Sequence, residues 1–518
     1  MRRIGIDVGG TNTDAVLVHE GRVERSVKSA TTADVTSGIV AAIRKLEPEG
    51  VIDAVLIGTT HFINAVVQRR GLSRVGALRI GAPATTSLPP FTDWPQDLAT
   101  MVDGGHWLIE GGHDYDGRPF MPLDRSAVAA AARAVRSRRL EAVAITAMFS
   151  PLTAAHEEEA AAIVREEAPG VVVTCSHRVG GIGLLERENA TLLNAALVPL
   201  ASETVRGFQR AISDLGVHAP LYVTQNDGTV TEAQRAVEFP VFSFASGPTN
   251  SMRGAAYLSR LEEAVVVDVG GTTADFGHLR NGFPREANAV VHVGGVRTLF
   301  RMPDLVSIGL GGGSLVDLSS HVVGPRSVGY RLTEQALVFG GDQLTATDLA
   351  VAAGLIDLGD RRRVAHLPAD LIQDVFRRIA ATLEDHVDRL KTESSDVTLL
   401  AVGGGAFLVP DGLAGVARVV RVDHGDCANA VGAAIAQVSG EVDQVFQGMS
   451  RAEAIASART LAEARAVEAG AAPDALRMVE AEDIPIAYLP GNAMRVKVKV
   501  VGEIASRREG RVSCKESD

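Results

Sequence analysis

The sequence carries one short hairpin pattern twice, first at residues 4–18 and again at residues 264–279. In both copies an apolar strand with an Asp near its end runs into Gly-Gly-Thr, and a second apolar strand follows. No helix-length segment separates the two apolar runs, so each copy predicts a β-hairpin with a glycine turn. Because the interval is far too long for a solenoid repeat, the chain is expected to contain two similar halves.

Each predicted hairpin places a carboxylate beside its glycine turn, Asp7 in the first copy and Asp268 in the second. Glycine lets backbone N–H groups approach a ligand, and successive N–H groups form an anion-binding nest to which Thr hydroxyls add donors. Since carboxylates repel phosphate, the combination implies a cation between them, most simply Mg²⁺ that keeps several waters. A purely structural turn explains one copy equally well, but explains two copies much less well.

Apolar runs alternate with segments of helical spacing along the rest of the chain. The pattern predicts strands at 55–60, 141–149, 171–175 and 221–229, and helices at 34–47, 124–139, 154–167, about 370–390, about 426–438 and 451–469. Residues 83–120, rich in Pro, Gly and Asp, are predicted to be irregular. The alternation predicts an α/β fold.

Net charge and cysteine content exclude several classes of protein. The 518 residues include 51 Lys or Arg and 63 Asp or Glu, a net charge of −12 that argues against binding nucleic acid or an anionic membrane. Cys175, Cys427 and Cys514 are too scattered for a disulfide framework or an iron–sulfur cluster. The first strand begins within three residues of Met1 and no apolar run reaches about 18 residues, so we expect a soluble cytoplasmic protein.

Two further glycine runs and one histidine-containing segment have open roles. Gly403, Gly404 and Gly405 lack the lysine of a Walker loop and the full dinucleotide-binding pattern, although their backbone would suit contact with adenine or ribose. The run at 307–318 predicts either a second anion nest or a hinge. The His and Asp residues of 104–116 form a candidate metal cluster, but neither their spacing nor a regular element supports it.

Other polar residues carry two interpretations each. His61 and Asn64 follow a predicted strand and could contact a substrate, or could cap and pack a helix. Glu186, Glu188 and Asn189 could line a cleft, or could form the solvated face of a helix.

The motifs as a series resemble a known family. They are GGTNTD (9–14), GTTHFINAVVQRRG (58–71), ENATLLNAAL (188–197), TQNDGT (224–229), FASGP (244–248), DVGGTTAD (268–275), SIGLGGGS (307–314) and NAVGAA (429–434). Over residues 3–440 the chain resembles the hydantoinase/oxoprolinase A family, which includes hydantoinase A proteins and acetone carboxylase β-like proteins, within the actin/Hsp70/sugar-kinase ATPase superfamily. Asn12 stands where longer members commonly have Phe.

The resemblance implies a two-lobed actin/Hsp70-like (ribonuclease H-like) ATPase fold with duplicated halves. Residues 1–185 would form the N-terminal lobe, and residues 186–440 the second lobe with the second phosphate motif and the adenosine motif. Residues 441–518 would form a small C-terminal α+β appendage.

The resemblance also implies roles for the motif residues. Asp7 and Asp268 would hold Mg²⁺ through water, while Asp14 and Asp275 would orient water or the phosphoryl acceptor, or else only cap their hairpins. Phosphoryl transfer requires the γ-phosphate charge to be met by metal and N–H donors in line with an acceptor. ATP would be bound by Gly9, Gly10, Thr11, Asn12, Thr13, Gly270, Gly271, Thr272, Thr273, Gly403, Gly404 and Gly405.

The function implied by the family is that of an ATP-dependent amidohydrolase subunit. Mg-ATP would phosphorylate, and so activate, a cyclic amide, lactam or carbonyl substrate, with a separate partner subunit encoded nearby and with homo-oligomerisation also allowed. The alternatives are an Hsp70-like or reactivase-like protein driven by nucleotide, and a small-molecule kinase. Nucleic acid and membrane partners are not expected.

Overall fold

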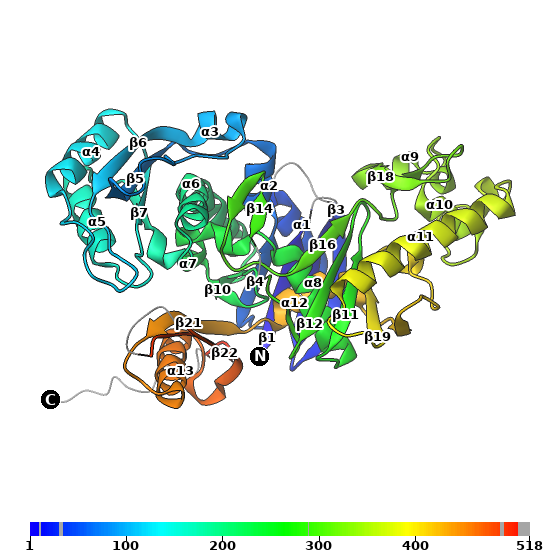
Figure 1. The fold of residues 1–518 in the computed structure, drawn as a ribbon. Helices are drawn as coiled ribbons and strands as arrows, with labels where there is room; N and C mark the ends of the chain where they lie inside the picture. The colour runs from blue at the N-terminus through cyan, green and yellow to red at the C-terminus, as the bar shows by residue number, and fades with distance from the viewer. Residues whose placement is uncertain (10–11, 31–34, 288–289, 487–491, 506–518) are drawn as a thin grey trace.

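The computed structural model describes residues 1–9, 12–30, 35–287, 290–486 and 492–505. The two predicted hairpins lie in two different sheets, and a smaller parallel sheet forms a separate layer at one end of the molecule (Figure 1). Each large sheet can therefore be followed outward from its hairpin.

The first hairpin organises one half of the molecule. Strand β1 (Arg2–Val8) pairs antiparallel with β2 (Asn12–His19), which pairs antiparallel with β3 (Arg22–Ala30). On its other side β1 runs parallel to β4 (Ala54–Thr59), which runs parallel to β9 (Leu221–Thr224). The order is thus β3-β2-β1-β4-β9, and apolar side chains bury β1 and β4 almost completely.

The second hairpin repeats this arrangement. Strand β11 (Ala264–Val269) pairs antiparallel with β12 (Ala274–Arg280), and β12 with β13 (Phe283–Pro284). Strand β11 also runs parallel to β19 (Val397–Val402), which runs parallel to β20 (Val416–Val420). The order β13-β12-β11-β19-β20 matches that of the first half, which confirms duplicated halves of ribonuclease H-like topology and the predicted two-lobed actin-like fold.

Two helices cross between the halves at a pair of glycines. Helix α8 (Ser246–Ser259) packs on α12 (Ala428–Ile435) more extensively than any other pair of helices in the described chain. A Cβ at Gly254 would overlap the carbonyl oxygen of Ala428, and one at Gly432 would overlap that of Asn250. The backbones can approach this closely only because neither glycine carries a side chain.

The separate parallel sheet has the order β6-β5-β7-β8: Asp103–Glu110, Val75–Ala82, Ala142–Ala147 and Val172–Cys175. Helices α4 (Arg125–Ser137) and α5 (Ala155–Glu167) cover the face that carries Leu78 and Ile145. The long helix α6 (Leu184–Asp214) covers the face that carries Ala77 and Ala144. This alternation of buried residues is typical of a parallel sheet covered on both faces.

The prediction that residues 83–120 are irregular is wrong in part. The segment contains helix α3 (Gln96–Val102) and strand β6. Gly104 and Gly105 weaken the strand pattern of β6, and pairing with β5 overrides that weakness. A Cβ at Gly104 would meet Leu140, so packing requires the glycine that obscured the strand in the sequence.

Strands from the C-terminal part of the chain extend the first-half sheet. Beyond β9 lie β10 (Val230–Glu232), β21 (Val438–Phe446), β23 (Met494–Gly502) and β22 (Arg477–Pro485), in that order. Helix α13 (Arg451–Glu468) buries four alanines, from Ala454 to Ala466, against this extension. The division at residues 185 and 440 stays a prediction, and the nine-stranded sheet takes strands from all three segments.

The other predicted helices are found within a few residues of their expected bounds. They include α1 (Val35–Leu46), α11 (Ala369–Leu390), α4, α5, α12 and α13. The remaining elements are α2 (His61–Gln68), α7 (Ala233–Glu238), α9 (Leu332–Gln335), α10 (Ala346–Ala352), β14 (Val291–Val293), β15 (Val296–Thr298), β16 (Leu305–Ile308), β17 (Ser314–Val316) and β18 (Val323–Ser327).

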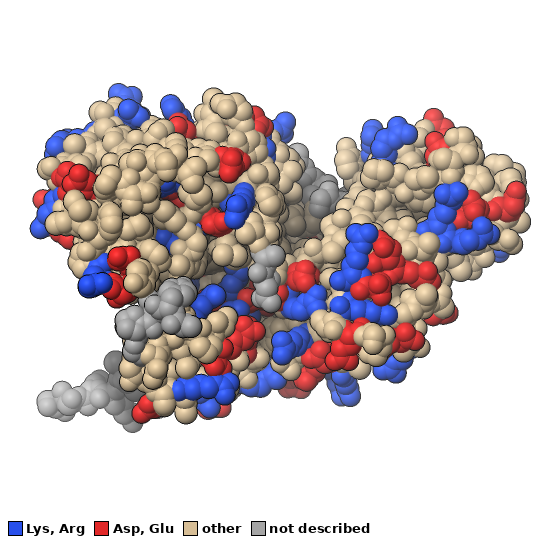
Figure 2. Space-filling model, in the orientation of Figure 1, with Lys and Arg blue, Asp and Glu red and all other residues tan. Residues whose placement is uncertain are grey.

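Acidic and basic side chains are intermixed over the face shown in Figure 2. None of the helices in the described residues combines the length and the apolar character needed to cross a membrane.

Candidate functional site

The two hairpin turns are closed by the same backbone hydrogen bond. Gly9 N–H donates to the Asn12 carbonyl (3.0 Å), and Gly270 N–H donates to the Thr273 carbonyl (2.9 Å). Asp7 faces Asp14 across the first hairpin, and Asp268 faces Asp275 at the same register of the second. Of the predicted phosphate-binding residues, Gly10 and Thr11 lie outside the described residues.

Thr13 and Thr273, both expected to bind ATP, do not occupy equivalent positions in the two hairpins. The strand register aligns Thr13 with Ala274, and Asn12 with Thr273. Thr13 is fully buried, with its Oγ1 beside Gly38 of α1, whereas Asn12 and Thr273 are exposed. Thr13 therefore belongs to the packing of α1 on the sheet, while Asn12 and Thr273 stay available at the turns.

Asp7 is a buried carboxylate held by two amides. Its Oδ1 accepts from Asn250 Nδ2 (3.2 Å), and its Oδ2 accepts from Asn429 Nδ2 (3.1 Å). Burial raises the pKa of Asp7 to about 6, and the charges of Asp14 and Asp268 add to this against the two amide hydrogen bonds.

Asp14 shares one of these amides. Asn429 Nδ2 also donates to Asp14 Oδ2 (2.9 Å), and the Lys28 ammonium lies 3.3 Å from Asp14 Oδ1. Burial raises the pKa of Asp14, although Lys28 and Asn429 oppose the shift. Lys28 in turn donates to the Asp426 carbonyl (2.5 Å), so it joins β3 to the loop before α12.

The second hairpin supplies two further carboxylates. Ser251 Oγ donates to Asp268 Oδ2 (2.5 Å), and burial raises the pKa of Asp268 with a contribution from the charge of Asp14. Burial also raises the pKa of Asp275 to about 6, against a hydrogen bond from Ser307, and the charge of Asp268 adds to it.

Asp7, Asp14, Asp268 and Asp275 together form what we call the carboxylate cluster. Asn250 and Ser251 are neighbours on α8, and one binds Asp7 of the first half while the other binds Asp268 of the second. The two predicted aspartates are therefore brought together across the two halves. Four buried or partly buried carboxylates with Lys28 as the nearby cation leave an excess of negative charge, which fits a hydrated divalent cation.

A glycine beside each aspartate makes room for its carboxylate. A Cβ at Gly58, which pairs with Asp7 from β4, would overlap Asp7 Oδ1 and Asn250 Nδ2. A Cβ at Gly403, directly after β19, would overlap Asp268 Oδ1. The duplicated halves thus repeat the space for the carboxylate as well as the carboxylate itself.

The two later glycine runs pack against the second hairpin turn. Gly312 and Gly313 donate to the carbonyls of Gly270 (3.0 Å) and Gly271 (2.8 Å), and Gly405 donates to that of Val269 (2.7 Å). The run at 307–318 is therefore a support for the turn rather than a free hinge. Only Gly404 of the 403–405 triplet has open space where a Cβ would stand.

The sequence matches two profiles of one known protein family. The sequence profile of the hydantoinase/oxoprolinase N-terminal region matches residues 3–168, and that of hydantoinase/oxoprolinase matches residues 187–390. The chain belongs to the hydantoinase/oxoprolinase family.

Curated relatives in this family include named subunits. The caprolactamase alpha subunit of Pseudomonas jessenii is 28% identical over 390 residues, which are 68% of this chain and 54% of that protein. The acetophenone carboxylase gamma subunit of Aromatoleum aromaticum is 26% identical over 406 residues, which are 68% of this chain and 53% of that protein. The chain therefore spans only about half the length of these two relatives.

Solved structures agree on the fold. The ATP-dependent caprolactamase from Pseudomonas jessenii has a TM-score of 0.76 at 21% identity, covering 97% of this chain and 88% of that chain. A nucleotide-free acetone carboxylase has a TM-score of 0.67 at 18% identity, with the same shares covered. Nearly the whole chain is thus covered by these two folds.

The candidate metal cluster in 104–116 is not formed in this family member. His106 lies 3.4 Å from Asp103, while the rings of His113 and His156 are tilted by 38° with their centroids 4.4 Å apart. Within the described residues, the three-residue group with metal-ligand spacing is instead Glu157, Cys175 and His177.

The carboxylate of this group already accepts hydrogen bonds from the protein. Glu157 Oε1 accepts from Ala147 N (2.7 Å) and Ser176 Oγ (2.5 Å), and Oε2 accepts from His177 N (3.0 Å) with His177 Nδ1 at 2.6 Å. Burial raises the pKa of the Cys175 thiol to about 12, which favours the neutral thiol. The hydrogen bonds of Glu157 tie α5 to β8, which is a structural role for the group.

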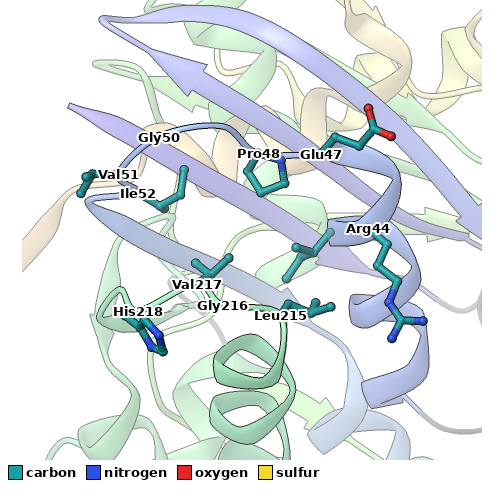
Figure 3. A pocket seen from close by; sticks show the side chains of 11 residues that line it. Arg44, Glu47, Pro48, Gly50, Val51, Ile52, Leu215, Gly216, Val217 and His218 are labelled. Carbon is teal, nitrogen blue, oxygen red and sulfur yellow. The ribbon is translucent and has the colours of Figure 1, made fainter.

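The cavity in Figure 3 is also remote from the carboxylate cluster. It encloses about 420 Å³ between the ends of α1 and α6 and is lined by Arg44, Ile52, Val217 and His218 among others. Its residues precede β4 and β9, whereas Asp7 pairs with Gly58 near the far end of β4. A strand rises about 3.3 Å per residue, so most of the length of β4 lies between the cavity and Asp7. The cavity is therefore not part of the site.

Sequence reasoning missed the residues that hold the aspartates. Asn250, Ser251 and Lys28 carry no local signal, because their partners lie far away in the chain. Asn429 is the first residue of NAVGAA, one of the segments that resemble the family. That resemblance is the signal by which Asn429 could have been found.

Proposed function

We propose that this chain is the ATP-using subunit of a hydantoinase/oxoprolinase-type amidohydrolase. The observation that carries the proposal is the convergence of Asp7 and Asp268, each beside a glycine turn, on adjacent residues of α8. Backbone N–H groups at two facing turns can meet the phosphates of ATP, and the carboxylate cluster can meet its metal.

The predicted residues fit these roles. Asp7 and Asp268 would hold Mg²⁺ through water, and Mg²⁺ would neutralise phosphate charge. Gly9, Asn12, Gly270 to Thr273 and Gly404 would face the nucleotide from the two turns and the adenosine motif. Asp14 and Asp275, on the second strand of each hairpin and opposite Asp7 and Asp268, would orient the attacking group. Gly403 and Gly405 would act indirectly, by making room for Asp268 and by supporting the turn.

The chemistry this arrangement supports is activation of an amide oxygen. The carbonyl oxygen of the substrate attacks the γ-phosphorus, the bond to the bridging oxygen breaks, and ADP leaves with the electron pair. Water then adds to the activated carbon, the C–N bond breaks as the nitrogen takes a proton, and a second water releases phosphate from the acyl group. We assign these last steps to a partner subunit, since the relatives are named as subunits.

ATP turnover against a substrate panel tests the proposal. Turnover should be measured with hydantoins, lactams, cyclic imides and simple ketones, with and without the protein encoded next to this chain. We expect Mg²⁺-dependent ADP release that one substrate class stimulates, and background release from Asp268→Asn.

Two other results would replace the proposal. Turnover that no small molecule alters would favour a nucleotide-driven conformational protein. A stable phosphorylated product, visible by phosphorus NMR, would favour a small-molecule kinase. Absence of Mg-ATP binding in calorimetry would remove all three interpretations.

A further inference from the structure

The side-chain amide of Asn429 sits between two carboxylates. Its Nδ2 donates to Asp7 Oδ2 (3.1 Å) and to Asp14 Oδ2 (2.9 Å). An NH₂ group has two hydrogens, so both of its donors are used by this bridge. One neutral side chain thus touches carboxylates from both strands of the first hairpin.

The orientation of this amide is fixed by its surroundings. Asn429 Oδ1 accepts from the backbone N–H of Ala430 (2.8 Å) at the start of α12. The opposite flip would turn a carbonyl oxygen toward two carboxylates, which is repulsive. The amide therefore cannot rotate without losing three hydrogen bonds at once.

Helix α12 is itself fixed relative to the other half of the molecule. Gly432 of α12 packs on the backbone of Asn250, and Asn250 donates to Asp7 Oδ1 (3.2 Å). The next residue, Ser251, donates to Asp268. A displacement of α12 would therefore be felt at the carboxylates of both halves.

We propose that Asn429 is a positioning residue: it holds the Asp7 and Asp14 carboxylates at one spacing, so that the site takes up a hydrated divalent cation together with nucleotide. The inference rests on the proposed function, because it assigns Asn429 to the same carboxylate cluster. Asn429 does not touch the cation or the substrate. It supplies an N–H donor to each of the two carboxylates, while Lys28 lies on the other oxygen of Asp14.

Binding of Mn²⁺ in the presence of ADP is the direct test. Free Mn²⁺ is counted by electron paramagnetic resonance while the metal is titrated into the full chain at saturating ADP. Loss of a group that orients metal ligands typically weakens metal binding about 10- to 100-fold. We expect a loss in this range for Asn429→Leu, while ADP binding in EDTA stays within twofold of wild type.

The matched control is Asp423→Asn, in the exposed loop that leads to the same helix. It removes a carboxylate near α12 without touching the cluster, so Mn²⁺ affinity should stay within twofold. Circular dichroism and the thermal midpoint verify folding of each variant. Should Asn429→Leu not fold, Asn429→Ser is used, because one hydroxyl can serve only one of the two carboxylates and an intermediate loss is expected.

A double-mutant cycle separates positioning from a general structural role. In an Asp14→Asn background the pair that Asn429 spaces no longer exists, so the effect of Asn429→Leu on Mn²⁺ affinity should shrink at least threefold. An equal effect in both backgrounds would overturn the inference, as would wild-type affinity in Asn429→Leu. If wild type itself binds no Mn²⁺ with ADP, the proposed function fails first.

Discussion

Asp275 is a carboxylate that the fold keeps in an unfavourable environment. Burial raises its pKa to about 6, well above the unfolded value of about 3.9. A raised pKa in the folded state means that stability is fully present below about pH 4 and is lost as the pH rises toward 6. This strain is expected at a site that has to accept a cation.

We predict that Asp275→Asn stabilises the metal-free protein at neutral pH. The gain should be small at pH 4, grow through pH 5, and level off above pH 6 at roughly 3 kcal/mol, because the variant has no charge to bury. Urea unfolding in EDTA at pH 4, 5, 6 and 7 measures it for both proteins. A difference that does not change with pH would contradict the assignment, and turnover should fall in the variant despite its greater stability.

The buried pair of Arg79 and Glu188 gives a second prediction at the residue scale. Arg79 Nε donates to Glu188 Oε1 (2.8 Å), a second bond joins Nη2 to Oε2, and both side chains are almost completely buried. Glu188→Gln should destabilise the protein by about 3–5 kcal/mol, because it leaves an uncompensated buried guanidinium. Glu238→Gln, in a surface pair with Arg178, should cost less than about 1 kcal/mol in the same urea titration.

Sequence patterns predicted the carboxylates of the site better than the neutral side chains that hold them. Asp7, Asp14, Asp268 and Asp275 were predicted because they recur at one offset in two copies of a hairpin. Neither interpretation of Glu188 and Asn189 was right, since Glu188 pairs with Arg79 and Asn189 accepts from Trp94 (2.7 Å). Such partners meet only through tertiary packing, which no local periodicity encodes.

Among the contacts between helices, the crossing of α8 and α12 leaves no space for a larger side chain at its two glycines. Gly432→Ala should destabilise the protein by about 1–3 kcal/mol, although alanine favours a helix, because its Cβ would push on the Asn250 carbonyl. Mn²⁺ affinity should fall with it, since Asn250 holds Asp7. Thermal unfolding and the metal titration measure both effects.

Gly412→Ala is the matched control for this crossing. Its Cβ would meet nothing within 4 Å, so the variant should be neutral or slightly more stable, by at most about 1 kcal/mol. Equal behaviour of the two variants would show that the crossing tolerates wider helix separation than its geometry indicates.

Helices were predicted well where a long apolar stripe faces one core. Helix α11 buries Leu371, Val375, Ile379, Leu383 and Val387 at helical spacing, and its bounds were predicted closely. Strand β6 was missed, because its two glycines serve close packing against Leu140 and Arg138 rather than a turn. Short elements of this kind depend on a neighbour that the sequence does not display.

For the whole molecule, a buried ionic cluster joins the C-terminal strands to the rest. Lys499 of β23 lies 2.7 Å from Asp227, and Arg301 lies 3.1 Å from the same oxygen. Although burial opposes it, these two cations hold the pKa of Asp227 well below its usual range. Its stabilising contribution is therefore present at neutral pH and is lost only as the pH falls.

Lys499→Met should weaken this connection. We expect a loss of about 3–5 kcal/mol, faster amide hydrogen exchange over β22 and β23, and acid unfolding at a higher pH than in wild type. Arg459→Met, which removes an exposed pair with Glu463 on α13, should change stability by less than about 0.5 kcal/mol. If amide hydrogen exchange in β23 is the same in Lys499→Met as in wild type, the ionic cluster does not hold the C-terminal strands in place.

The position of β23 also constrains how this protein is made. It lies between β21 and β22 in the sheet that also contains β1. Just after β23, the carboxylate of Glu503 lies 2.6 Å from the guanidinium of Arg3 in β1. A nascent chain leaving the ribosome therefore exposes an open edge on β21 until residues 494–502 have been synthesised. Until these residues pair, the open edge of β21 can pair with a strand of another chain, so aggregation during synthesis is expected to begin there.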